Sequence, residues 1–178
     1  LAKAKPDALS FASSGSGGAP HLAAELFNSL AGVKMVHIAY KGSAPSFIDV
    51  LGGQVPLTMD SLTQGLPYVK SGRLRAVATL GPTRSPVFPE VPTVGETLKG
   101  YEVVNWFGLV APAATPREVI TRLHGEIVKI LRMPDIKERL SSQGADPVGS
   151  TPEEFGAFMK SEAAKWARVI KDANIRAD

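Results

Sequence analysis

The chain has 178 residues, of which 44% are hydrophobic and 21% charged, values typical of a globular protein with one mid-sized domain or two small lobes. The net charge is only +3 and there is no basic run. The sequence therefore lacks the positive charge pattern typical of a nucleic-acid-binding protein. The absence of cysteine excludes disulfides, thiol catalysis and cysteine metal sites.

The start of the chain has no targeting pattern. Residues 1–12 lack the basic-then-apolar layout of a secretion signal, and no stretch approaches the 18 or so apolar residues of a membrane span. Leu1 is not an initiator Met, and the first segment has the pattern of a helix end that runs into a strand. We therefore expect a fragment of a longer protein.

The first half of the chain alternates short apolar runs with helical patterns, which indicates βα units and a mostly parallel sheet. Strands are expected over residues 8–13, 33–40, 55–59 and 74–80, and helices over 18–31 and 45–51, with a short helix after Asp60 that Pro67 starts or interrupts. The first helix has an apolar stripe formed by Leu22, Leu26, Phe27 and Leu30.

The second half begins after a loop over residues 81–93 that contains four prolines. Residues 101–111 form one extended apolar run, which we interpret as a strand that crosses between two lobes. Helical periodicity follows, with capping boxes predicted at Thr115 with Glu118 and at Thr151 with Glu154, and a short helix after Pro134. The last helix is expected to end near residue 173.

The segment SSGSGGAPH, residues 13–21, lies between an expected strand and an expected helix. Glycines allow a tight turn that exposes backbone N–H groups, and the first turn of a helix has unpaired donors and a positive dipole end. An anion fits there without a lysine. The alternative is a simple capped helix in which Ser16 satisfies those donors and nothing binds.

Two further turns, residues 40–45 and 59–62, occupy the same kind of junction. Because the carboxyl ends of parallel strands meet at one edge of a sheet, we expect three helix starts to converge on one pocket. A small carboxylate or phosphate ester is the expected ligand, and Asp60 can accept a hydrogen bond from an ammonium or hydroxyl group. The hydroxyl donors predicted for this pocket are Ser14, Ser16, Ser43 and Ser61.

Established anion and catalytic motifs are not matched. The loop after Gly15 lacks the GK[ST] ending of a P-loop, and its pattern reaches Pro20 where a dinucleotide fingerprint has its third glycine. No serine lies in a GxSxG turn. We therefore expect no cofactor and no catalytic residues.

The three histidines do not form a metal motif, and no metal is expected. His21 and Glu25 are one helical turn apart and could share a cation, but a solvated polar face together with Asn28 is the favoured interpretation. His37 is expected to be a hydrogen-bonded core or face residue of its strand. His124 is expected to be exposed on a helix.

A few other side chains are weaker candidates. Lys41 is expected to be exposed, although it lies next to the second turn, and Arg73 and Arg75 indicate a surface ion pair. Trp106 and Phe107 are more often core residues than ligand-stacking ones. Crossing strands line clefts, however, and Trp106 is therefore included as a candidate.

The order of these segments resembles the substrate-binding receptors of the tripartite tricarboxylate transporters, the Bug receptors. The similarity covers the whole chain and is carried by long segments, SSGSGGAPHLAAELF (13–27), YKGSAPSFIDVLGGQV (40–55), SGRLRAVATLGPTRSPVFPEVPTVGET (71–97), NWFGLVAPAATP (105–116) and the TPEEF that opens the last helix.

The resemblance implies a two-lobed periplasmic α/β binding protein of type II that traps a carboxylate and delivers it to a membrane permease. Residues 1–103 would be the second, ligand-binding lobe, and residues 104–178 the crossing strand and C-terminal helices of the incomplete first lobe. By position, the family's ligand contacts fall on Gly15 to Gly18 with His21, on Gly42 to Ala44 and on the Asp60 region. The predicted set is Ser14, Gly15, Ser16, Gly17, Gly18, His21, Gly42, Ser43, Ala44, Asp60, Ser61 and Trp106.

The segment that begins the family's first lobe has no counterpart here. We therefore expect apolar residues of the crossing strand to face missing partners, so that the chain either self-associates through residues 104–178 or is part of a larger molecule. Ligand binding by the chain alone is expected to be weak or absent. Two other functions stay open: the ligand-sensing domain of a transcription regulator, and an α/β enzyme acting on a phosphorylated or acyl substrate.

Overall fold

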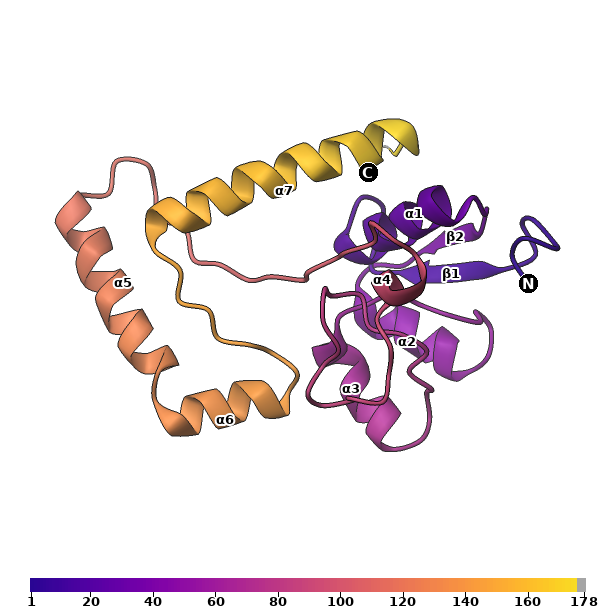
Figure 1. Ribbon diagram of the computed structural model, residues 1–178, viewed down its shortest axis with the longest axis horizontal. Helices are drawn as coiled ribbons and strands as arrows, with labels where there is room; N and C mark the ends of the chain where they lie inside the picture. Colours follow the sequence, from indigo (N-terminus) through magenta and orange to yellow (C-terminus); the bar gives the residue numbers. More distant parts are fainter. Residues whose placement is uncertain (176–178) are drawn as a thin grey trace.

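The computed structural model describes residues 1–175 as an α/β structure with a small parallel sheet (Figure 1). The elements, in chain order, are β1 (Ser10–Ser13), α1 (Ala19–Ala31), β2 (Val36–Ala39), α2 (Ser43–Leu51), α3 (Leu62–Lys70), α4 (Val94–Thr97), α5 (Arg117–Leu131), α6 (Pro134–Ser142) and α7 (Pro152–Asp172). In Figure 1, α1 lies above the sheet, and α2 and α3 lie below it.

The sheet is parallel, as predicted, but it is shorter than the four expected strands. β1 pairs with β2 from Ser10 with Val36 to Ser13 with Ala39. The expected strand 55–59 reduces to a parallel bridge between Ala12 and Thr58 on the other side of β1. Pro56 has no N–H to donate to a ladder, which limits pairing on that side.

The expected strand 74–80 is also absent as a strand. It makes one isolated parallel bridge, between Thr79 and Thr93, with Thr79 N–H donating to Pro92 O at 2.8 Å. The neighbouring Pro92 has no N–H, so a continuous ladder with residues 91–94 cannot form. This segment therefore belongs to the loop region that surrounds α4.

The core lies between the sheet and α1. One cluster of buried residues contains Phe11, Ala24 and Met35. The other contains Ala23, Tyr101 and Val103, against which Trp166 of α7 packs. These contacts connect α7 to α1.

The buried face of α1 differs from the predicted leucine stripe. Leu30 is exposed, and Leu22, Leu26 and Phe27 are only half-buried. The buried residues of this helix are Pro20, His21, Ala23, Ala24 and Asn28. Small residues allow the helix to approach the sheet closely, so that polar side chains on the same face become buried.

Helix ends confirm part of the predicted capping. Thr151 and Glu154 form the predicted capping box at the start of α7. The box predicted at Thr115 and Glu118 is wrong, because α5 starts one residue later with Pro116 as its N-cap and no side-chain cap bond. Thr115 N–H instead donates to Pro112 O in a preceding turn at 2.9 Å.

The short helix α4 was not predicted, although Thr93 and Glu96 have the spacing of a capping box and form one. Arg84 also binds Glu96 with two hydrogen bonds, of 2.7 and 2.6 Å. Together with the backbone N–H of Thr93, this guanidinium lowers the pKa of Glu96 to about 2.

Residues 104–111 do not form the predicted crossing strand. Val103 N–H donates to Leu80 O at 2.8 Å, and beyond this residue the chain runs as an extended connection without an assigned strand (Figure 1). A strand needs a neighbouring strand for its ladder, and the described residues provide none here.

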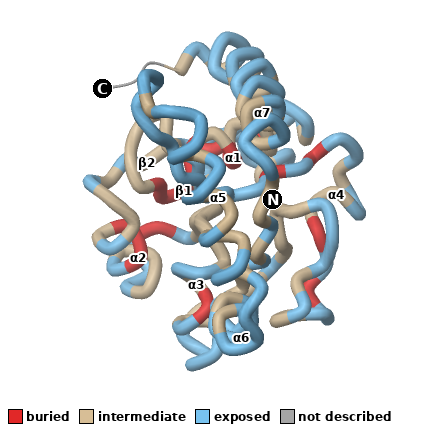
Figure 2. Tube along the Cα trace, turned by 90° about the vertical axis from the view of Figure 1, so that its left-hand side faces the viewer, coloured by how far each residue is buried: buried red, intermediate tan, exposed pale blue. Residues whose placement is uncertain are grey.

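One face of this extended segment packs against α7. The Trp106 ring meets Phe155 and Phe158 edge-on, with ring centroids 5.5 Å apart in each pair. A β-carbon at Gly108 would collide with the Phe155 ring. The other face is bare, and no residue from 104 to 175 is buried (Figure 2). None of the helices within residues 1–175 is long and apolar enough to cross a membrane.

Candidate functional site

The turns after β1 and β2 lie side by side at the carboxyl edge of the sheet, as the sequence predicted. Tyr40 N–H donates to Ser13 O at 3.0 Å, and Gly42 N–H donates to Ser14 O, also at 3.0 Å. The third turn follows Thr58, whose hydroxyl donates to Ala12 O at 2.9 Å. Because all three segments run parallel to β1, the starts of α1, α2 and α3 share this edge.

The three helices start without a side-chain cap. Their N-cap residues are Gly18, Gly42 and Ser61, and none of them makes a side-chain cap bond. The Ser16 cap considered from the sequence is therefore not formed. α4 and α7, by contrast, close their own ends with capping boxes. The shared edge thus retains helix N–H donors that protein side chains do not fill.

Two glycines are required by the backbone at this edge. Gly17 has φ of 74° and Gly42 has φ of 104°, a region that side chains with a β-carbon rarely adopt. No other residue comes within 4 Å of a β-carbon built at Gly42. The space beside the second turn is therefore open.

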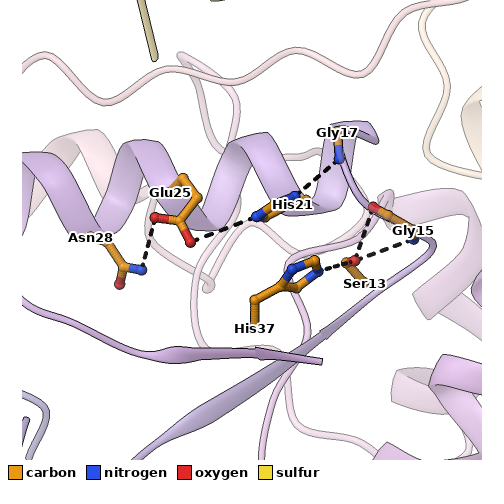
Figure 3. Close-up of polar contacts among 7 residues, drawn as sticks. All are labelled: Ser13, Gly15, Gly17, His21, Glu25, Asn28 and His37. Carbon is orange, nitrogen blue, oxygen red and sulfur yellow. Dashed lines mark hydrogen bonds and ion pairs between the residues drawn. The ribbon is translucent and has the colours of Figure 1, made fainter. Parts of the chain in front are cut away.

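His21 is buried, so the prediction of a solvated polar face is wrong. It is 7% exposed, and its Nδ1 accepts a hydrogen bond from Gly17 N–H at 3.0 Å. Its Nε2 lies 3.7 Å from Glu25 Oε1, and Glu25 in turn accepts from Asn28 Nδ2 at 3.3 Å (Figure 3). Burial lowers the pKa of His21, and the Glu25 carboxylate opposes this change.

His37 forms a hydrogen bond and packs on the core, as predicted for this residue. Its Nε2 lies 2.5 Å from Ser13 Oγ, and its ring stacks on His21 with centroids 3.6 Å apart and planes at 16° (Figure 3). Phe11 also contacts this ring, with centroids 5.0 Å apart, and its own centroid lies 6.2 Å from that of His21. Sequence reasoning missed Ser13 and this stacking, because the pairing of Phe11 with His37 is set by the sheet register and has no local signal in the sequence.

The Ser13 and His37 pair has the composition of a nucleophile and a base, but its position excludes that use. Ser13 is 0% exposed, and its hydroxyl is enclosed by His37, by Gly15 O at 3.2 Å and by Gly15 N at 3.2 Å. A substrate cannot reach this oxygen, and the pair instead fixes the glycine turn.

The third turn carries a carboxylate with one unused oxygen. Asp60 Oδ1 accepts from Ser61 N–H at 2.7 Å, while Asp60 Oδ2 is buried and has no hydrogen-bond partner. An unsatisfied buried oxygen of this kind favours a donor such as a hydroxyl, an ammonium group or water.

The remaining predicted site residues fall into two groups. Ser14, Gly15, Ser16, Gly18, Ser43 and Ser61 are half-buried at the three turns, and Ala44 is exposed there. The Trp106 ring does not belong to this group, because it packs against α7 instead. It is 38% exposed.

The weaker candidates do not join the site. Lys41 is exposed as predicted. Arg73 lies over the Tyr68 ring, 5.8 Å from its centroid, and does not form the predicted ion pair with any residue that the structure describes. His124 is half-buried, with Nε2 3.1 Å from Ser150 O, because the loop before α7 covers it. The prediction of an exposed His124 is therefore wrong.

The uncapped helix starts at this edge leave backbone amides that can donate hydrogen bonds to an anion. Within residues 1–175, no group of three or more His, Asp or Glu side chains could hold a metal ion. Two open hollows, of about 350 and 500 Å³, are lined by residues between 82 and 102 and between 69 and 92. Neither of them includes a residue of the three turns.

Comparison with known proteins gives a consistent match along the chain. A family profile described as "Tripartite tricarboxylate transporter family receptor" matches residues 1–175. The "UPF0065 protein in tcbD-tcbE intergenic region" of Pseudomonas sp. is 38% identical over an alignment of 179 positions, which covers 99% of this chain and 53% of that protein. The chain therefore spans about half the length of this relative.

Solved structures show the same arrangement. A structure of an R. palustris protein with adipate superposes with a TM-score of 0.91 at 34% identity, over 98% of this chain and 58% of that one. The periplasmic binding protein BugD gives a TM-score of 0.84 at 33% identity, over 99% and 60% of the two chains. The α/β fold of these binding proteins is thus present in this chain.

Proposed function

Because the chain belongs to the tripartite tricarboxylate transporter receptor family, we propose that it acts as an extracytoplasmic, non-enzymatic receptor that captures a small carboxylate for a membrane permease. One observation carries the proposal: α1 and α2 start without a side-chain cap, and the hydrogen bond from Gly42 N–H to Ser14 O holds the turns before them side by side. The periplasm is the proposed location, since a similar protein, BugD, is described as periplasmic.

The ligand class follows from the donors at the edge. Backbone N–H groups at a helix start, with the positive dipole end behind them, favour a carboxylate without a cationic side chain. An adipate complex of a protein 34% identical to this chain supports the same class. The proposed contacts to the carboxylate are Ser14, Gly15, Ser16, Gly17, Gly18, Gly42, Ser43 and Ala44.

The other proposed contacts differ in kind. Asp60 would repel a second anion, so we assign its unpaired oxygen to a hydroxyl or a bridging water of the ligand site, beside Ser61. His21 acts on the backbone of the first turn, because its Nδ1 is already bonded to Gly17 N–H. Trp106 is the proposed contact from the other wall of the cleft.

The division into lobes is part of the proposal. Residues 1–103 form the ligand-binding lobe, and residues 104–178 belong to a second lobe that needs further chain to be complete. The bare face of residues 104–111, with Phe107 87% exposed, favours self-association of the isolated chain or coverage by the rest of a longer protein.

The test is an adipate titration of the chain followed by ¹H–¹⁵N NMR. With one cleft wall incomplete, we expect a Kd of about 1 mM or weaker, which NMR detects. The amide signals of residues 14–18 and 42–44 should shift together. Shifts that leave both turns unaffected would refute the proposed site.

A matched pair of glycine variants sharpens this test. Gly42→Ala and Gly72→Ala each add a β-carbon at a glycine with positive φ and open space around it, and the strain is larger at Gly42, whose φ of 104° and ψ of 167° are adopted essentially by glycine alone. Only Gly42→Ala should abolish the adipate-induced shifts. Equal behaviour of the two variants would remove the second turn from the site.

A further inference from the structure

The glycine turn after β1 is held by two histidines rather than by a cap residue. Gly17 N–H donates to His21 Nδ1 at 3.0 Å. Gly15 N–H donates to Ser13 Oγ at 3.2 Å, and that oxygen lies 2.5 Å from His37 Nε2. The two imidazole rings stack at 3.6 Å (Figure 3). The turn, α1, β1 and β2 are thus connected through one stacked pair of rings, of which His21 is buried and His37 is half-buried.

The bond from Gly17 fixes the tautomer of the neutral His21 ring. A ring nitrogen that accepts an amide N–H carries no proton, so the neutral His21 ring must carry its proton on Nε2, facing Glu25. A second proton would occupy Nδ1 and displace the Gly17 N–H. Protonation of His21 therefore removes the restraint on this turn.

The surroundings of His21 make this protonation state sensitive to pH. Glu25 on α1, 3.7 Å from Nε2, favours the cation. His37 on β2 stacks on the ring and would repel the His21 cation when it is itself protonated, and the facing side chains of β1, Phe11 and Ser13, are uncharged. Burial, which is the largest effect, lowers the pKa of His21.

We propose that His21 and His37 are positioning residues of the carboxylate site, and that the first turn keeps its ligand-binding conformation only while His21 is neutral. This inference rests on the proposed function for its effect on affinity. Its structural part, the coupling between His21 and Gly17, is independent of any ligand.

The first experiment measures that coupling in the ligand-free chain. The Gly17 amide signal and the His21 ring signals should titrate with the same midpoint, at a pH below that of an ordinary histidine. In His21→Asn, whose Oδ1 replaces the Nδ1 acceptor, the Gly17 signal should keep its folded position and stop titrating.

The second experiment compares adipate affinity in the original chain and in His21→Asn at pH 7.5 and pH 5. Ionisation of the ligand cancels in the ratio of the two affinities. We expect the original chain to lose affinity relative to the variant by about fivefold on acidification. His37→Gln, whose side-chain amide can still bond to Ser13, should keep the turn and the affinity at pH 7.5, whereas His37→Ala should weaken both.

The outcomes are separable. A Gly17 signal that titrates equally in His21→Asn, or that does not follow His21 in the original chain, would overturn the inference. A coupled titration with a constant affinity ratio would overturn its functional part. If adipate shifts no signal of the turns, the proposed function fails, while the ligand-free titration still decides whether the histidines position the turn.

Discussion

Residues 1–103 and residues 104–175 both contain regular helices, but only the first region contains buried side chains. Every buried side chain of the described chain lies between Phe11 and Val103. The second region contains α5, α6 and the 21-residue α7, none of which has a buried residue (Figure 2). Helix formation is therefore a local property here, whereas a core requires a second layer that the later region lacks.

The largest expected effect comes from matched aromatic truncations in the two regions. Phe11→Ala should destabilise the chain by about 3–5 kcal/mol, because a fully buried ring leaves a cavity. Phe107→Ala should change stability by less than about 0.5 kcal/mol, because its ring is already 87% exposed. Urea unfolding at concentrations where the chain is monomeric measures both values, and similar losses would mean that residues 104–111 are packed within the monomer.

Association in solution tests the bare face directly. Light scattering of the isolated chain should show concentration-dependent oligomers, and the double variant Phe107→Asp with Leu109→Asp should shift the population to monomer. Ile48→Asp, at an exposed apolar position of α2, is the control and should leave association unchanged. A monomeric chain that binds no apolar dye would refute self-association.

Capping inside the second region gives a smaller effect. Thr151→Ala removes the acceptor for Glu154 N–H and should cost about 1 kcal/mol of α7 stability. Thr115→Ala should be nearly neutral, because Pro116 is the N-cap of α5. Amide exchange of the first turn of each helix reports the two changes, and an equal response would contradict the assigned helix starts.

The smallest expected effect concerns pH and the loop around α4. The pKa of Glu96 is lowered to about 2 by Arg84, so its contribution to stability is present above the ordinary value of 4.5 and is lost as the pH falls toward 2. Both side chains are exposed, and the expected contribution is therefore small. Between pH 2 and 6, the denaturation midpoint should depend less on pH in Arg84→Ala than in the original chain. Arg117→Ala, whose ion pair with Glu153 is looser, should keep the original pH dependence. Parallel profiles in all three chains would contradict this role of Arg84.

The sequence predicted the helices and the glycine turns more accurately than the sheet. Periodicity and local end signals placed α1, α2 and α7 within a few residues, since both depend on neighbours along the chain. The strands over 55–59 and 74–80 were overestimated because an apolar run says nothing about its partner, and in both places a proline interrupts the ladder.

At the candidate site, the sequence indicated which turns meet but misplaced the side chains behind them. The order of parallel strands was enough to bring Ser14 beside Gly42. His21 and Asn28 have polar side chains, which favoured a solvent-facing position, whereas close packing of Ala23 and Ala24 draws their helix face onto the sheet. The stacked rings of His21 and His37 come from residues 16 positions apart and left no periodic signal.

The sequence by itself determined the parallel βα order, the helix ends marked by Thr151 and by the glycines, and the place of the glycine turns between strand and helix, because each depends on backbone geometry that nearby residues impose. Only the tertiary structure decided which face of α1 is buried, which histidine nitrogen restrains the first turn, and that residues 104–111 run without a neighbouring strand. These features depend on contacts between distant segments, and such contacts form only where a complementary surface is present.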